Sequence, residues 1–160
     1  HTAIIHVSDS RVSSIPDSTS VCDLWVENGS GNRTTIVRQG EPFRIMLQFD
    51  SQIVSPVDAA IVVENGKKQP LFATHLSDLS APAVGKGIHT YAVPIDNPPL
   101  RNGRYLASIA LFSPDQRLFY DVIYHFPLFD VAGVFDPGFP NDIRWGDLYF
   151  PIEWRLDSEC

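Results

Sequence analysis

The sequence lacks the features that identify membrane-spanning and nucleic-acid-binding proteins. It has no run of about 18 consecutive apolar residues, the length that a membrane-spanning helix requires. Acidic residues outnumber basic ones by 19 to 12, the formal net charge is −7, and no basic cluster occurs beyond Lys67-Lys68. Because nucleic acids and anionic lipid surfaces bind clustered positive charge, we expect no nucleic-acid partner and no direct membrane insertion.

Motifs for catalysis and for nucleotide binding are also missing. The chain contains no Gly-x-Ser-x-Gly turn, no Gly-x-Gly-x-x-Gly and no phosphate-binding Gly-x-x-x-x-Gly-Lys loop. Its five histidines show no His-x-x-x-His spacing, and zinc needs three or four convergent ligands, so we expect neither a metal site nor a cofactor. We interpret Asp121 and Asp130 as turn or edge residues rather than as a glycosidase pair, and we assign no catalytic residue.

Cysteine and methionine are scarce. The two cysteines, Cys22 and Cys160, are too few for a disulfide framework. A single bridge between them and two free thiols are the two interpretations, and we favour the free thiols.

The chain begins at His1 without an initiator Met or a signal peptide, which we interpret as the start of a segment from a longer protein.

Helical periodicity is almost absent, and short alternating runs take its place. The 13 prolines and 10 glycines fall mostly between these runs, as in β-proteins with frequent turns. Residues 43–50 alternate apolar with mostly polar side chains, as a half-buried strand does, and Asn65-Gly66 marks a hairpin turn. The predicted strands are 3–7, 20–27, 34–38, 43–50, 57–63, 71–74, 87–95, 105–112, 121–130 and 145–154. We therefore predict one β-sandwich domain over residues 1–160.

Three segments, taken in order, resemble a known family. Residues 38–49 carry Gly40-Glu41 before a strand, residues 100–111 carry a Leu-x-x-Gly-x-Tyr pattern, and Tyr120-Asp121 precedes a run of apolar side chains that includes Phe126, Phe129 and Val131. Together they resemble the C-terminal carbohydrate-binding domain of Wzt-type proteins. These are the ATPase subunits of ABC transporters that export O-antigen polysaccharide, and the resemblance spans roughly residues 20 to 155.

The resemblance implies an all-β, immunoglobulin-like sandwich of two antiparallel sheets. It implies that the domain binds O-polysaccharide without catalysis, and that it forms a homodimer in which the last strand can be exchanged. ATP hydrolysis would belong to an N-terminal nucleotide-binding domain, absent from this chain, and the full-length protein would meet a transmembrane subunit. The implied location is cytoplasmic, at the inner face of the inner membrane.

The resemblance does not carry binding residues over, so the candidates come from the predicted strand faces. Tyrosine can stack on a sugar ring, and arginine, glutamine and histidine can hydrogen-bond its hydroxyls. Tyr120 and Tyr124 are expected on one side of their strand, with Asp121 and His125 on the other. The candidate carbohydrate-binding residues are Arg44, Gln48, His89, Tyr91, Tyr120, Tyr124 and His125.

The run 105–112 is apolar on both faces, which is unusual for a strand with one side in solvent. One face is assigned to the core and consists of Tyr105, Ala107, Ile109 and Leu111. The opposite face consists of Leu106, Ser108, Ala110 and Phe112. Its small central residues predict a shallow floor, which either a sugar ring or a partner's exchanged strand would cover.

Two other functions are consistent with the same residues. A sandwich-fold glycan hydrolase or lyase would shorten the glycan that it binds. A protein-interaction module of the adhesin type would pair by strand addition. A Walker motif upstream of His1 would favour the transporter domain, and a secretion signal there would favour the interaction module.

Overall fold

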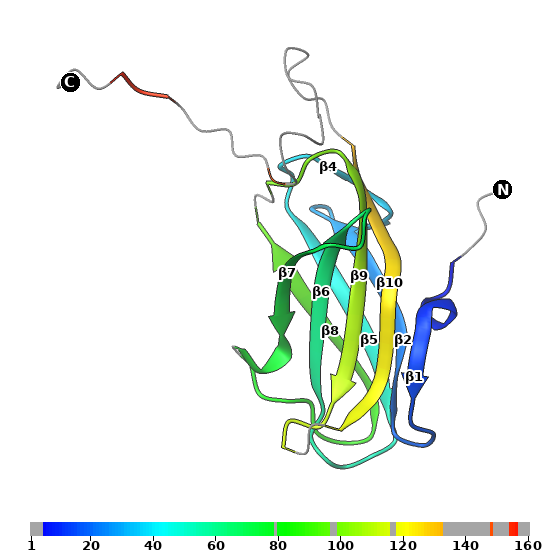
Figure 1. Cartoon of the computed structure of the whole chain (residues 1–160). Helices are drawn as coiled ribbons and strands as arrows, with labels where there is room; N and C mark the ends of the chain where they lie inside the picture. Colours follow the sequence, from blue (N-terminus) through cyan, green and yellow to red (C-terminus); the bar gives the residue numbers. More distant parts are fainter. Residues whose placement is uncertain are drawn as a thin grey trace.

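A computed structural model describes residues 5–78, 80–96, 99–115, 118–132, 148 and 154–156, and within them nearly all regular structure is β-strand (Figure 1). The two 3-10 helices are η1 (Val7–Ser10) and η2 (Leu76–Asp78). The strands are β1 (Arg11–Ser14), β2 (Thr19–Asn28), β3 (Arg33–Thr34), β4 (Ile36–Arg38), β5 (Phe43–Ser51), β6 (Asp58–Asn65), β7 (Pro70–His75), β8 (Gly87–Ile95), β9 (Gly103–Phe112) and β10 (Phe119–Ala132).

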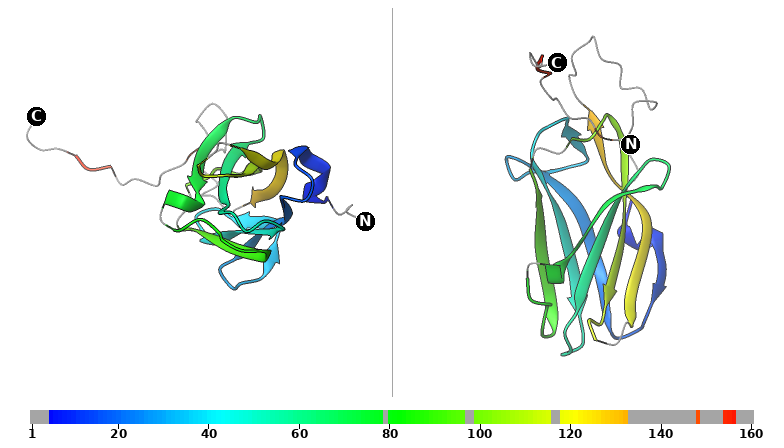
Figure 2. Two further views of the ribbon diagram at one scale, coloured as in Figure 1. Left: turned by 90° about the horizontal axis from the view of Figure 1, so that it is seen from below. Right: turned by 60° about the vertical axis from the view of Figure 1, so that its left-hand side comes forward.

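The strands form two sheets that pack face to face (Figure 2). The first sheet, called sheet A, has the order β1-β10-β9-β6-β7, and β4 pairs in parallel with the end of β10. The second, sheet B, has the order β3-β2-β5-β8. Every other pairing is antiparallel. The predicted all-β sandwich is therefore confirmed.

Alternating side chains build the core between the sheets. In β5 the residues Phe43, Ile45, Leu47 and Phe49 are each no more than 2% exposed, while the residues between them face outward. In β9 the predicted core face is confirmed, because Tyr105, Ala107, Ile109 and Leu111 are all buried. Full burial of one large apolar side chain contributes about 1.5–3 kcal/mol, so these two central strands supply much of the driving force for folding.

Tyr105 also fixes the entry to β9. Its hydroxyl donates a hydrogen bond to the carbonyl oxygen of Arg101, four residues upstream, at 2.6 Å. Its ring stacks on Phe129 of β10 with the centroids 5.2 Å apart. This is the geometry of the tyrosine corner that is found in immunoglobulin-like sandwiches. It explains why a Gly-x-Tyr pattern opens this strand.

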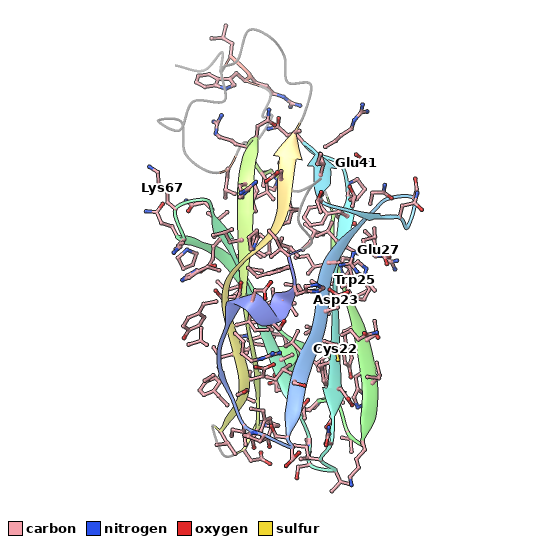
Figure 3. All side chains as sticks on the ribbon, turned by 90° about the vertical axis from the view of Figure 1, so that its right-hand side faces the viewer. Cys22, Asp23, Trp25, Glu27, Glu41 and Lys67 are labelled. Carbon is pink, nitrogen blue, oxygen red and sulfur yellow. The ribbon has the colours of Figure 1, made fainter. Side chains whose placement is uncertain are left out.

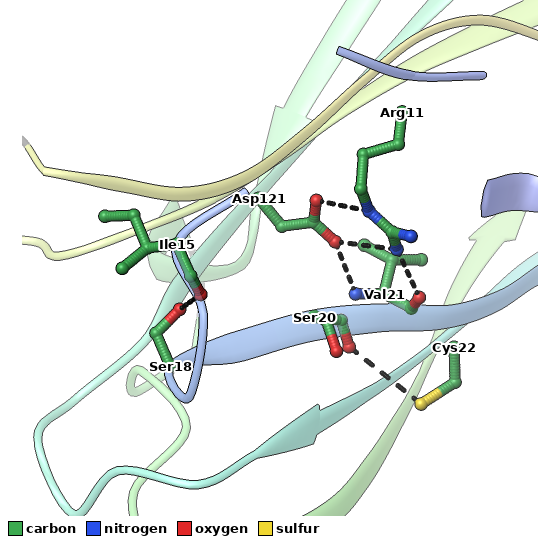
Figure 4. Close-up of polar contacts among 7 residues, drawn as sticks. All are labelled: Arg11, Ile15, Ser18, Ser20, Val21, Cys22 and Asp121. Carbon is green, nitrogen blue, oxygen red and sulfur yellow. Dashed lines mark hydrogen bonds and ion pairs between the residues drawn. The ribbon is translucent and has the colours of Figure 1, made fainter. Parts of the chain in front are cut away.

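A buried ion pair ties the two sheets together at the β1 edge (Figure 4). Asp121 of β10 is 0% exposed, and its carboxylate accepts bonds from Arg11 Nε at 2.8 Å and from Arg11 Nη2 at 3.1 Å. The same carboxylate accepts the backbone N–H of Val21, in sheet B, at 2.8 Å. Asp121 thus holds β1 against β10 and also fastens β10 to β2. The interpretation of Asp121 as a turn or edge residue was wrong, since it is fully buried within β10, which pairs with β1 on one side and with β9 on the other.

Other predicted elements differ from the structure in identifiable ways. Val7 begins a 3-10 helix rather than ending a strand, and β1 starts only at Arg11. The predicted strand 34–38 is divided, because β3 pairs with β2 in sheet B while β4 pairs with β10 in sheet A.

The tail lies largely outside the described residues. Of the predicted strand 145–154, Leu148 forms an isolated bridge with Leu100, and Trp154 is 94% exposed outside any strand. Cys160 is not described either, so the alternative of a Cys22–Cys160 bridge stays a prediction.

Candidate functional site

The seven candidate residues fall in separate regions of the sandwich. Arg44 and Gln48 lie on the outer face of sheet B, where Gln48 donates a hydrogen bond to Thr90 at 3.3 Å. Arg44 pairs with Glu27 of β2, and the Trp25 indole donates a second bond to Glu27 at 3.1 Å. Figure 3 shows Trp25 and Glu27 on the same strand. The Trp25 hydrogen bond, and after it the bond from Arg44, lower the pKa of Glu27.

His89 and Tyr91 share one side of β8, as expected, but this side faces the core. Their rings stack on the buried ring of Phe49, with centroid separations of 5.3 Å for His89 and 6.0 Å for Tyr91. His89 Nε2 also lies 2.8 Å from the carbonyl oxygen of Gly85. Both side chains are half-buried and already serve packing and loop closure.

Tyr120 is buried as well, with only 7% of its surface exposed. It lies at an irregularity in the β9–β10 pairing, between Phe119, which pairs with Phe112, and Asp121, which pairs with Leu111. Tyr120 is packed in the core cluster and does not present a ring to solvent.

Tyr124 and His125 are the two candidates that the structure brings together. The β9–β10 register shifts between Ile123 and Phe126, so that two residues of β10, Tyr124 and His125, lie opposite a single residue of β9. Their ring centroids lie 5.7 Å apart. The expectation that they would lie on opposite sides of the strand was wrong, because a β-bulge interrupts the alternation there.

His125 adopts a left-handed backbone conformation, with φ of 56°. This conformation is uncommon for a residue other than glycine, and such strain gathers at functional sites. Ser108 holds the bulge, because its Oγ accepts the backbone N–H of His125 at 3.1 Å. The same hydroxyl donates to Glu64 Oε1 at 3.0 Å.

Glu64 connects this bulge to β6. Its side chain is 6% exposed, and Oε1 lies 3.0 Å from His125 Nδ1. Since a carboxylate accepts hydrogen bonds, His125 donates through Nδ1–H, and Nε2 has no bonding partner within the described ranges. The His125 side chain is 35% exposed. Its Nε2 is therefore the polar group that this cluster offers to a ligand.

A shallow groove runs beside this cluster over the outer face of sheet A. Its volume is about 170 Å³. It is lined by Ala60, Val62, Ser108, Ile109, Ala110, Phe119, Val122 and Tyr124. We call it the outer groove. Ser108 and Ala110 contribute to it, as predicted from the small centre of that strand face. Phe119 is 53% exposed and Tyr124 is 51% exposed. Packing in the core does not account for two half-exposed aromatic rings.

Two larger pockets lie at the edges of the sandwich, between the two sheets. One, between β7 and β8, has a volume of about 400 Å³ and includes Leu47, Ile61 and Tyr91. The other, beside β2 and β10, measures about 440 Å³ and includes Leu24, Arg33 and Phe126. Both have core side chains in their walls, and in the second Arg33 is already paired with Asp23 at 2.7 Å. We regard them as edges of the core rather than as recognition sites.

The cluster is not arranged as a serine nucleophile would be. A nucleophilic serine gives its proton to a histidine ring nitrogen, and a carboxylate orients that histidine. Here Ser108 Oγ donates to the carboxylate of Glu64 and accepts from the backbone of His125. The hydrogen bonds therefore orient His125 and stabilise the bulge.

Sequence reasoning missed Glu64 and Phe119. Glu64 follows a mostly apolar run, residues 57–63, and stands directly before the Asn65-Gly66 turn. A carboxylate at a strand end normally reaches solvent. Its burial depends on its contacts with β9 and β10, which the sequence alone does not reveal. Phe119 could have been found, because it follows the hairpin turn and pairs with Phe112 on the strand face that the sequence singles out.

No described helix has the length and apolarity to cross a membrane. Among the described residues, no three His, Cys, Asp or Glu side chains are grouped so that they could hold a metal ion.

A family model and one solved structure agree with the fold. The family model described as the Wzt C-terminal domain matches residues 20–140. A crystal structure of the C-terminal domain of wzt superposes with a TM-score of 0.71, at 12% sequence identity, over 97% of this chain and 98% of that chain. A β-D-mannosidase from Dictyoglomus thermophilum gives a TM-score of 0.48 at 20% identity, over 69% of this chain and 13% of that one. Curated protein sequences give no match.

Proposed function

Because this chain belongs to the Wzt C-terminal domain family, we propose that it binds O-antigen polysaccharide and thereby selects the glycan that an ABC transporter exports. We place the binding site at the outer groove and the adjoining His125. The observation that carries the proposal is the pair of half-exposed rings, Phe119 and Tyr124, beside a shallow floor.

The aromatic rings of the groove and the adjoining His125 match the two kinds of surface on a sugar, which are its apolar C–H faces and its hydroxyls. Aromatic rings stack on the C–H faces of a pyranose, and Phe119 and Tyr124 supply such rings. Hydroxyls need fixed hydrogen-bonding groups, and His125 Nε2 supplies one that Glu64 holds in position. An open groove also suits a long chain, which must enter and leave along a sheet face rather than through a closed pocket.

In this proposal the domain does no chemistry of its own. Ser108 and Glu64 stabilise the bulge, and ATP hydrolysis belongs to a nucleotide-binding domain elsewhere in the full-length protein. That protein acts as a homodimer on the cytoplasmic face of the inner membrane, together with a transmembrane subunit. The family membership of the chain supports this assembly.

The test is retention of purified O-polysaccharide from the source strain on the immobilised chain. We expect retention of this glycan and none of a polysaccharide with a different repeat. Tyr124→Ala and Phe119→Ala should each weaken binding about three- to tenfold, since the ligand would cover the exposed half of each ring and full burial contributes about 1.5–3 kcal/mol. Lack of retention of the cognate glycan by the wild-type chain would overturn the proposal.

Two further variants separate the faces of the sandwich. Ile88→Ala truncates an apolar side chain that is 57% exposed on sheet B and should leave binding unchanged. Gln48→Ala tests the outer face of sheet B, which also carries candidate residues. If Gln48→Ala weakens binding and Tyr124→Ala does not, the recognition face is that of sheet B. The bound glycan should keep its chain length on a gel, whereas shortening would indicate an enzyme.

A further inference from the structure

Resting on the proposed function, we infer that the outer groove selects a neutral 6-deoxyhexose unit of the glycan. Such a sugar carries a methyl group at C6 in place of a hydroxymethyl or carboxylate group. The inference depends on which atoms line the groove, on where the polar atoms lie, and on the charge around them.

The groove floor offers almost nothing to a hydroxyl group. Six of its eight lining residues have side chains without a hydrogen-bonding atom, and these are Ala60, Val62, Ile109, Ala110, Phe119 and Val122. Ser108 Oγ already donates to Glu64 and accepts from His125. A hydroxyl that settled on this floor would lose water without gaining a partner, whereas a methyl group would gain from the contact.

Polar groups adjoin this floor at Tyr124 and His125. Tyr124 carries a hydroxyl on a half-exposed ring, and the His125 ring lies beside that ring, with the centroids 5.7 Å apart. A ligand that fits must therefore be polar along one edge and apolar along the other. A 6-deoxyhexose has this character, because its ring hydroxyls remain while the C6 substituent becomes apolar.

Charge excludes acidic sugars from the same place. Of the described residues that line the groove, none is Lys or Arg, and the buried Glu64 carboxylate lies 3.0 Å from His125 Nδ1. The whole chain also carries a formal net charge of −7. A uronic acid would bring its carboxylate toward this carboxylate and gain no basic partner among the described residues of the groove.

The size of the groove fits one ring. Its volume of about 170 Å³ is close to that of cavities that hold a single benzene-sized ring. Selection would thus act on one sugar unit at a time and would leave the rest of the chain on the open sheet face.

The experiment compares methyl glycosides that differ only at C6. The ¹⁵N-labelled 160-residue chain is titrated by NMR with methyl L-rhamnoside against L-mannoside, D-rhamnoside against D-mannoside, and L-fucoside against L-galactoside. Methyl glucuronide is the charged control. In at least one pair the deoxy sugar should bind about tenfold more tightly, because a hydroxyl that loses water without gaining a partner costs about that factor. The largest shifts should fall on Ala110 and Val122.

A substitution on the floor supplies the second readout. Ala110→Ser places a hydroxyl where none is available, so the preference for the deoxy sugar should fall several-fold. Ala92→Ser, on an exposed face of sheet B, makes the same chemical change away from the groove and should leave the preference intact.

The outcomes separate this inference from the proposed function. Equal binding within all three pairs overturns the inference, as do shifts confined to another face, tighter binding of the glucuronide, or no shift with any deoxy sugar at high millimolar concentration. If the chain still retains its O-polysaccharide in any of these cases, the proposed function stands. If the polysaccharide is not retained, the proposed function fails independently of the monosaccharide result.

Discussion

Removal of the Asp121 carboxylate should destabilise the sandwich more than any other single charge change described above. The carboxylate is 0% exposed and accepts three hydrogen bonds, two from Arg11 and one from the Val21 N–H. Breaking a fully buried ion pair from one side costs about 3–5 kcal/mol, which is the upper range here because the Arg11 side chain is 25% exposed and keeps its bond to the Val21 carbonyl oxygen. For a chain of this length that corresponds to a fall in Tm of about 6–20 °C.

The measurement is urea unfolding of Asp121→Ala and Asp121→Asn, followed by tryptophan fluorescence. Asp121→Asn should lose less, because its amide oxygen can still accept the Val21 N–H although the charge is gone. The matched control is Asp130→Ala, since Asp130 lies on the same strand and pairs with Arg104 at 3.2 Å, with side chains 45% and 65% exposed. An exposed pair contributes about 0–1 kcal/mol. A loss below about 1 kcal/mol for Asp121→Ala, or equal losses at both positions, would refute the reasoning.

Three further predictions concern stability and reactivity. Tyr105→Phe should lose about 1 kcal/mol in urea unfolding, because it removes the hydroxyl of the tyrosine corner and leaves the ring in place; an unchanged midpoint would contradict this. Partial burial and the nearby Asp50 raise the pKa of the Cys22 thiol, so in a Cys160→Ser chain iodoacetamide should react with it more slowly at neutral pH than with glutathione. Glu27 has a lowered pKa, so its contribution to stability is complete above the unfolded-state pKa of about 4.3 and is lost as the pH falls through the folded-state value. The difference in urea midpoint between wild type and Glu27→Gln should accordingly be constant from neutral pH down to about pH 5 and shrink in stronger acid; a difference independent of pH would argue against the lowered pKa.

The sequence predicted the architecture correctly wherever the local residue pattern matches the burial of the side chains in the fold. Strand 43–50 alternates because one face meets the core, and the Asn65-Gly66 turn joins two strands that pair. The face of 105–112 that begins with Tyr105 was correctly assigned to the core, and the small side chains of Ser108 and Ala110 do line a hollow.

The details of the site depend on contacts that no local pattern contains. His125 and Glu64 are 61 positions apart, and Arg11 and Asp121 are 110 apart, so neither pair has a spacing signature. The β10 bulge reverses which side chains face outward after Ile123, and a strict alternation of two cannot anticipate it. Tyr91 shows a second limit of prediction from sequence. A polar aromatic residue on an edge strand can pack inward as readily as outward, and the local pattern does not distinguish the two.

The residues that line the groove differ in how freely they can be substituted. Most can be replaced without breaking a side-chain hydrogen bond, whereas a substitution of Ser108 would break the bonds that it makes. Because Ser108 supports both the left-handed backbone of His125 and the buried Glu64, its replacement would disturb the bulge together with the groove. The side chains of Ala60, Ala110, Phe119 and Val122 make no such bonds and can be exchanged for others of similar size. If the proposed function holds, substitutions at these positions would change which glycan the groove accepts, one side chain at a time, while Ser108 and the bulge stay unchanged.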